Sequence, residues 1–232
     1  MKENKWIYRG LISVIAIIFI ISFKEYQTRI DTLKLEKQEL EQKNNQLEAT
    51  ASYNDSEPAD VETANYHNWS ELESTADNFV VDSDGEFKKS WGIYLANEAK
   101  KYEIDPYIVY ELLKVETGNT FDPSLVGPET KYGQAYGMSQ FMKNTAPWIA
   151  DMADLPYDEE LLFDPYYSMQ LSVVYLDFLH HEYDNWDEAL TAYHRGMSGM
   201  ETYKESNGTA KSDYAVKIQT KAEEHKTIVL AN

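Results

Sequence analysis

YIVYELLKVETGNTFDP, residues 107–123, is the stretch from which the fold of this chain is best predicted. Its apolar residues recur at the spacing of one helical face: Ile108, Leu112 and Val115. Asp105-Pro106, directly before it, is typical of a helix start, with the acid as N-cap and the proline in the first turn. Gly118-Asn119 supplies residue types on which helices end. The stretch therefore predicts a helix from Tyr107 to about Thr117.

Glu116 is the candidate functional residue of this helix. It lies in the last turn, beside the apolar face, where the helix dipole disfavours negative charge. Partial burial would act in the same direction, so both effects raise the pKa of the carboxyl group. A proton donor that works near neutral pH needs such a shift. We therefore expect Glu116 to be a general acid.

The remainder of the C-terminal half predicts further helices around this one. A loop over residues 121–135 leads into helical character over 139–151, in which Pro147 marks a first turn or a break. Later helices are predicted to begin at Asp164-Pro165, at Asp187 and near Asp213. No stretch alternates as a strand does, so the fold class is all-α, or α with minimal β, in a domain of residues 88–232.

Residues 1–25 are predicted to be an uncleaved signal anchor. Thirteen uncharged residues, LISVIAIIFIISF, follow a basic N-terminal flank and extend, with the apolar residues before them, to about the lower limit of a spanning helix. A secretory signal peptide has similar length, but no small-residue cleavage site follows. The basic flank places the N-terminus in the cytoplasm and the remainder outside.

Residues 26–49 and 50–87 are predicted to connect the anchor to the domain. Apolar residues recur every seven positions at Tyr26, Leu33, Leu40 and Leu47. They predict a short helical stalk, which fits either a weak parallel homodimer or a single solvated helix. Residues 50–87 are acidic and polar, which favours a flexible linker. Two pieces within it, HNWSELEST and DNFVV, contain apolar residues that would suit a short docking helix.

Composition excludes several functions. A net charge of −19 argues against nucleic-acid binding, which needs clustered cations. The chain has no cysteine, and hence no disulfide or thiolate metal site. His180-His181-Glu182 lacks the spacing of a helical zinc motif. We therefore expect neither a metal nor a cofactor.

Four separated groups of residues, together with a closing motif, follow a pattern seen in one enzyme family. They are Val115-Glu116-Thr117 with Phe121-Asp122-Pro123, Gly137-Met138-Ser139-Gln140 with Thr145-Ala146, Asp164-Pro165 with Tyr175-Leu176, and Ala189-Leu190 with Ala192-Tyr193-His194; Tyr214, Lys217 and Ile218 form the closing motif. In their types and order they resemble the lysozyme-like domain of the soluble lytic transglycosylase (SLT) family. The resemblance covers about residues 90–220.

The resemblance implies a membrane-anchored enzyme that cleaves the β-1,4 bond between N-acetylmuramic acid and N-acetylglucosamine in a peptidoglycan glycan strand. Glu116 would serve as the single acid and base and would leave 1,6-anhydro ends, without a cofactor. Thr117 would orient it. The residues implied to line the sugar subsites are Gly137, Met138, Ser139, Gln140, Tyr193, His194 and Tyr214.

Departures from the family pattern leave alternatives open. His194 replaces an asparagine, which would add sensitivity to pH, and Ser139 replaces a methionine. The loop between Pro123 and Gly137 is long and contains Glu129. If Glu129 or Asp122 activated a water, the enzyme would be a muramidase; a non-catalytic wall-binding module is the other alternative.

Overall fold

The structure is a computed structural model that describes residues 24, 27–30, 32–34, 37, 43 and 69–230, the last five of them by backbone only. The chain divides into two compact units, residues 1–49 and 50–232. The described residues of the first unit are helical. This agrees with a helical stalk but leaves its dimerisation a prediction.

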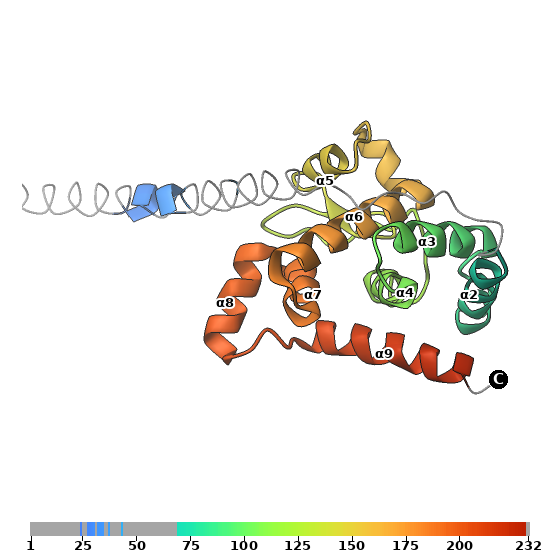
Figure 1. Cartoon of the computed structure of the whole chain (residues 1–232). Coiled ribbons are helices and arrows are strands. Elements are labelled where there is room, and N and C mark those ends of the chain that lie inside the picture. Colours follow the sequence, from blue (N-terminus) through green and yellow to red (C-terminus); the bar gives the residue numbers. More distant parts are fainter. Residues whose placement is uncertain are drawn as a thin grey trace, which may run out of the picture. The chain divides into compact units, whose positions relative to one another are not determined.

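The described part of the second unit is helical, with a minimal two-stranded sheet (Figure 1). Its α-helices are α2 (Trp69–Asp82), α3 (Lys89–Lys101), α4 (Pro106–Glu116), α5 (Ala146–Met152), α6 (Pro165–Tyr183), α7 (Trp186–Arg195), α8 (Met197–Asn207) and α9 (Asp213–Leu230). A 3₁₀ helix, η2, spans Glu159–Phe163. Strands β1 (Ala135–Tyr136) and β2 (Phe141–Met142) pair antiparallel. The predicted fold class, α with minimal β, is confirmed.

Local capping explains why two of the predicted helices begin where they do. The carboxylate of Asp105 accepts a hydrogen bond from the Tyr107 backbone N–H at 3.0 Å, at the start of α4. The carboxylate of Asp164 accepts from the first turn of α6 in the same way. Each acid satisfies backbone donors that would otherwise lack partners, and each is followed by a proline in the first turn.

Two of the predicted elements need correction, and one helix was missed. The N-cap of α7 is Asn185, whose side chain accepts from the backbone N–H of Asp187, so Asp187 lies inside the helix that it was expected to cap. Residues 139–145 form turns and β2 rather than helix, and α5 begins at Ala146 with Pro147 in its first turn. The helix α8 was not predicted.

The predicted linker over residues 50–87 overlaps a packed element. Helix α2 packs against α3, and its Phe79 side chain has no exposed surface. The Phe79 ring stacks on Tyr110 of α4 at a centroid distance of 4.3 Å and meets Phe87 edge-on at 5.7 Å. The folded unit therefore begins at least as early as Trp69, and the domain boundary predicted at residue 88 is too late.

Residues 1–23 and 25 of the predicted anchor lie outside the described residues. Residues 50–68 of the predicted linker lie outside them as well. Within the part of the chain that the structure describes, no helix has both the length and the apolar character needed to cross a membrane.

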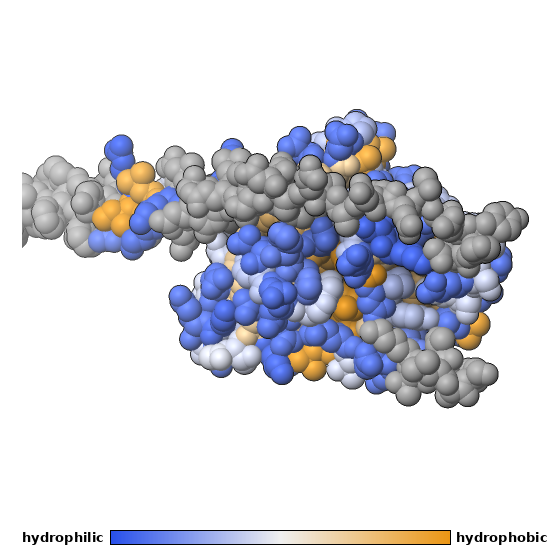
Figure 2. Space-filling view, viewed as in Figure 1, coloured by the Kyte–Doolittle hydropathy of each residue, from blue (hydrophilic) through white to orange (hydrophobic). Residues whose placement is uncertain are grey.

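Large apolar residues that reach the surface of the folded unit are scattered over it. On the face in Figure 2, apolar surface forms small areas separated by hydrophilic side chains. The exposed residues are Trp69, Val81, Val126, Tyr132, Phe163, Tyr166 and Val216. Single exposed apolar residues are ordinary in soluble domains, so a site must be argued from particular side chains and their partners.

Candidate active site

Glu116 is the last residue of α4 and lies beside the core, with its side chain partly buried. Burial raises the pKa of its carboxyl group to about 7, and a hydrogen bond from Tyr214 opposes that rise. A carboxyl group in this state exchanges a proton readily near neutral pH. The structure therefore gives Glu116 the property expected from its position at the helix end.

Tyr214, at the start of α9, is the direct partner of this carboxyl group. Its hydroxyl donates to Glu116 Oε1 at 2.6 Å, across 98 residues of sequence. Burial and the neighbouring Glu116 raise the pKa of the Tyr214 hydroxyl well above its ordinary value, so the hydroxyl remains a donor. The sequence predicted Tyr214 as a substrate-binding residue, whereas the structure makes it a partner of the acid.

His194 packs against the Tyr214 ring on its solvent-exposed side. Its exposed ring stacks on Tyr214 with centroids 4.5 Å apart and planes 6° apart. Burial of part of the ring and the positive charge of Arg195 lower the pKa of His194, which favours the neutral imidazole. His194 thus presents an exposed aromatic ring directly beside the partner of Glu116.

Tyr193 joins the site to a buried group of hydroxyls. Its own hydroxyl donates to the Ser139 carbonyl at 3.1 Å and lies 3.2 Å from Ser172 Oγ. Ser172 in turn lies 2.5 Å from Ser139 Oγ, which bonds the Ser168 carbonyl at 2.7 Å. Burial and the charge of Glu116 raise the pKa of Tyr193 well above its ordinary value. Tyr193, on α7, therefore connects the turn that contains Ser139 to α6. Its hydroxyl also lies close enough to Glu116 for the charge of that carboxylate to raise its pKa.

Sequence reasoning missed Ser168 and Ser172. They lie four residues apart on α6 and are fully buried. A signal was present, since small polar residues at i and i+4 on an apolar helix predict a shared buried partner. The identity of that partner, Ser139, depends on tertiary packing.

Four predicted site residues have structural roles. Thr117 is 4% exposed; its hydroxyl donates to the Leu113 carbonyl and accepts from the Phe121 N–H, so it fixes the turn after α4. Met138 belongs to the core, and Ser139 has no exposed surface. Gly137 has φ +72°, and a Cβ there would lie 1.8 Å from the Leu162 carbonyl oxygen, so only glycine fits. The side chains at these positions do not line an open subsite.

Gln140 is partly exposed and holds two neighbouring segments together. Its side-chain amide donates to the Gly137 carbonyl at 2.8 Å and to the Leu125 carbonyl at 3.4 Å. Its backbone has φ +49°, a conformation that a non-glycine residue adopts only when its surroundings impose it. Gln140 therefore shapes the turn beside Tyr193.

The two acids considered as partners for Glu116 lie in different surroundings. The carboxylate of Asp122 accepts from the backbone and the hydroxyl of Ser124, and these bonds lower its pKa. Asp122 is thus engaged in its own turn. Glu129 is exposed on the following loop.

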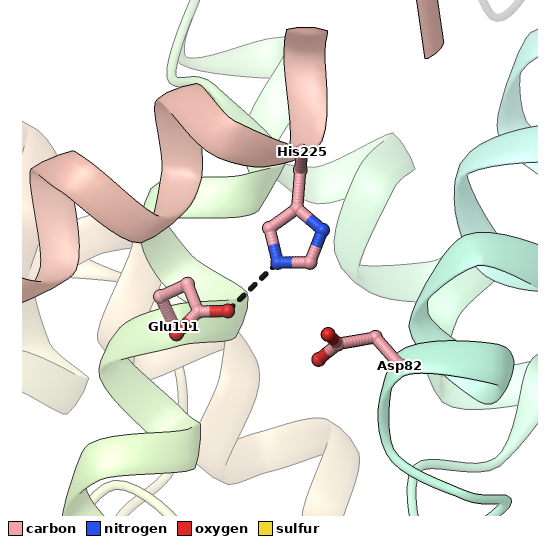
Figure 3. Close-up of side chains that lie close together, drawn as sticks. All are labelled: Asp82, Glu111 and His225. Atoms are coloured by element: carbon pink, nitrogen blue, oxygen red, sulfur yellow. Dashed lines mark hydrogen bonds and ion pairs between the residues drawn. The ribbon is translucent and has the colours of Figure 1, made fainter. Parts of the chain in front are cut away.

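Among the described residues, one group has the ligand types of a metal site: Asp82, Glu111 and His225, with ligand atoms within 4.8 Å of one another (Figure 3). Lys114 Nζ is paired with Asp82 and lies 3.7 Å from Glu111 Oε1, while His225 Nε2 lies 2.8 Å from that oxygen. A lysine ammonium thus already supplies positive charge between the two carboxylates. The group joins α2, α4 and α9, and we assign no metal to it.

Comparisons with known proteins agree with the helical arrangement. A family model described as the transglycosylase SLT domain matches residues 93–216, more than half of the chain. The X-ray structure of an inactive mutant of lytic transglycosylase Slt from Pseudomonas aeruginosa is similar, with a TM-score of 0.50 and 18% identity. The match covers 69% of this chain and 31% of that one, so this chain spans less than a third of the length of that protein. No curated protein gives a match.

Proposed function

The chain belongs to the transglycosylase SLT domain family, and we propose that it cleaves the β-1,4 bond between N-acetylmuramic acid and N-acetylglucosamine in peptidoglycan as a lytic transglycosylase. The observation that carries the proposal is the Glu116 carboxyl group, whose pKa is about 7 and whose oxygen accepts a hydrogen bond from Tyr214 at 2.6 Å. No second acid is needed.

In the first step, protonated Glu116 donates its proton to the glycosidic oxygen as the bond to the muramyl C1 breaks. The leaving strand departs as an alcohol, and an oxocarbenium-like centre remains. The Glu116 carboxylate then takes the proton of the sugar's own C6 hydroxyl, and O6 bonds to C1. This closes the 1,6-anhydro ring and returns Glu116 to its protonated form, so no water is consumed.

Tyr214 supports both steps because its hydroxyl remains a donor. A hydrogen bond to the carboxylate stabilises the charged form that follows the first proton transfer and holds the oxygen in place for the second. The local turn of Asp122 supports a single-acid mechanism, because that carboxylate is already bonded to Ser124.

The experiment is release of soluble muropeptides from purified peptidoglycan, with Glu116→Gln as the variant and mass spectrometry of the products. Wild type is expected to release anhydro-ended fragments, and Glu116→Gln, which cannot transfer a proton, is expected to release none. Equal release by the two proteins would remove Glu116 from catalysis. Hydrated ends would show a muramidase, and the absence of any release by wild type would leave a wall-binding module.

We further propose that residues 1–25 anchor the protein in the cell membrane with the catalytic domain facing the wall, and that the stalk over residues 26–49 forms a weak homodimer. The uncharged segment behind a basic flank and the heptad spacing support this. Full-length protein should sediment with membranes and be accessible to protease only from outside. Recovery in the soluble fraction would contradict the anchor, and failure of stalk cysteine pairs to cross-link would contradict the dimer.

A further inference from the structure

Residues 125–137 form an ordered hairpin, which we call the 125–137 hairpin. At its base the Gly137 N–H donates to the Leu125 carbonyl at 2.9 Å, and the Gly127 N–H donates to the Ala135 carbonyl at 2.8 Å. At its tip Thr130 and Gly133 exchange two backbone hydrogen bonds, at 3.1 and 3.0 Å. The segment that the sequence predicted as a loop is thus preorganised by its own backbone.

The base of the 125–137 hairpin lies at the candidate active site. One strand leaves the turn that Thr117 fixes directly after Glu116. The other enters the turn in which the Ser139 carbonyl accepts from Tyr193. Gln140 closes the base through its bond to Leu125. Both ends of the hairpin therefore connect to turns that lie beside the catalytic acid or its neighbour Tyr193.

The tip presents an exposed aromatic ring on a fixed turn. Tyr132 is 62% exposed, and its backbone N–H donates to Thr130 Oγ1 at 3.1 Å. Lys131 Nζ lies 4.7 Å from the centre of the Tyr132 ring, so a cation and an aromatic face share the tip. Tyr132 is five residues from Gly137, so its Cα lies at most about 18 Å from that of Gly137, the limit of a fully extended chain.

A second lysine lies beside a tyrosine ring nearer the base. Tyr136 meets Phe163, which is 37% exposed, edge-on at 6.0 Å, and Lys143 Nζ lies 4.8 Å from the centre of the Tyr136 ring. Aromatic rings with apolar faces and polar edges suit the faces of sugar rings, and lysines suit carboxylates. Lys143 is already paired with Glu159, and the Tyr136 ring is only partly exposed. In a chain with a net charge of −19, the tip is therefore where a lysine, Lys131, lies on an exposed aromatic ring.

We propose that the 125–137 hairpin is an accessory binding surface for the glycan strand, with Tyr132 stacking on a sugar remote from the cleaved bond and Lys131 facing the carboxylates of the stem peptides. The inference rests on the proposed function for its ligand. Because the hairpin is held by backbone bonds, the ring is presented with little loss of entropy on binding.

Binding of the catalytically disabled Glu116→Gln protein to insoluble peptidoglycan tests this surface without any turnover. Tyr132→Ala in that background is expected to weaken binding at least about fivefold, which corresponds to roughly 1 kcal/mol. Tyr132→Phe, which keeps the aromatic face, should bind as the parent does. Trp69→Ala is the matched control, because Trp69 is an aromatic residue with 51% exposure on α2, away from the hairpin.

Unchanged binding after Tyr132→Ala, or an equal loss after Trp69→Ala, would overturn the proposal, as would a parent protein that does not bind peptidoglycan. Thermal unfolding of Tyr132→Ala should match that of the parent, because the side chain lies outside the core. Failure of the proposed function would appear separately, as absence of muropeptide release by wild type, while the binding comparison would still decide the role of the hairpin.

Discussion

At the scale of single residues, Glu116 owes its chemistry to two opposing effects. Burial raises the pKa of the carboxyl group, and the hydrogen bond from Tyr214 limits the rise, with a result of about 7. Near neutral pH both forms of the acid are then populated, as a group that first donates and then accepts a proton requires.

Tyr214→Phe is expected to move the alkaline limb of the pH–activity profile to higher pH. The hydroxyl favours the charged carboxylate, so its removal raises the pKa of Glu116 further, and the acid keeps its proton over a wider range. The maximal rate should fall about tenfold or more, because the carboxylate formed in the first step loses a charge-assisted hydrogen bond. Tyr166→Phe is the control, because the Tyr166 hydroxyl donates to Ser90 at the exposed surface. An unshifted alkaline limb would show that Tyr214 does not act on Glu116.

Glu116→Gln should increase the stability of the fold above pH 7. The folded-state pKa of Glu116 is raised above its ordinary value, so the wild type gains stability from this group below about pH 4.5 and loses it as the pH rises through about 7. Glutamine carries no charge and avoids the loss, which we put at about 2 kcal/mol after allowing for partial exposure. Urea unfolding at pH 5 and pH 8 measures it. Equal pH dependence of the two proteins would contradict a raised pKa.

At the scale of elements, boundaries set by neighbouring residues could be predicted from the sequence. Asp105 and Asp164 cap helices because acid and backbone donor lie two residues apart. Asn185 and Asp187 are both suitable caps, and composition alone does not choose between them. The ordering of residues 125–137 depends on backbone bonds across a turn, which turn residues suggest but do not specify.

The place of α2 could not be predicted, because its sequence is as acidic as the predicted linker around it. What fixes the helix is contact with residues far along the chain, above all the stacking of Phe79 on Tyr110. A short apolar segment in a polar region has the same sequence pattern whether it packs against the domain or remains in solvent. Only the complementary surface on α3 and α4 decides it.

Phe79→Ala is expected to lower the free energy of unfolding by about 3–4 kcal/mol, because it removes a fully buried ring from an aromatic cluster. Val81→Ala is the control on the same helix. Val81 is 77% exposed, so its loss should change stability by less than about 0.5 kcal/mol. Chemical denaturation of the two variants measures the difference in the free energy of unfolding. Equally small effects of both substitutions would show that α2 does not contribute to the folded domain.

At the scale of the whole molecule, the site depends on α9 reaching back to α4. The Tyr214–Glu116 bond spans 98 residues, and no local pattern indicates such a pairing. The family motifs include both Glu116 and Tyr214, but the contact between them follows only from the packing of α4 and α9. The chemistry of Glu116 could thus be predicted from its helix, whereas its partner could not.

The same two helices meet a second time, further along α9. His225 of α9 bonds Glu111 of α4 at 2.8 Å (Figure 3). The His225 ring also stacks on Tyr107, with the ring centroids 4.9 Å apart. Glu111 is 2% exposed. Burial alone would raise the pKa of nearby Asp82, but hydrogen bonds from Lys114 and Tyr110 outweigh it and hold that pKa below its ordinary value. The Asp82 carboxylate is therefore charged. Asp82, Glu111, Lys114 and His225 together form a polar cluster that connects α2, α4 and α9.

His225→Ala is expected to lower the free energy of unfolding by about 2 kcal/mol, because it leaves the buried Glu111 carboxylate without its closest donor. Glu111→Ala made in the His225→Ala background should then cost less than it costs alone, since the partner is already gone. Lys221→Ala, which removes an exposed ion pair from the same helix, should leave stability nearly unchanged. Strictly additive effects of the two substitutions would show that His225 and Glu111 do not hold α9 on α4, and that the Tyr214 contact secures the helix without help from its far end.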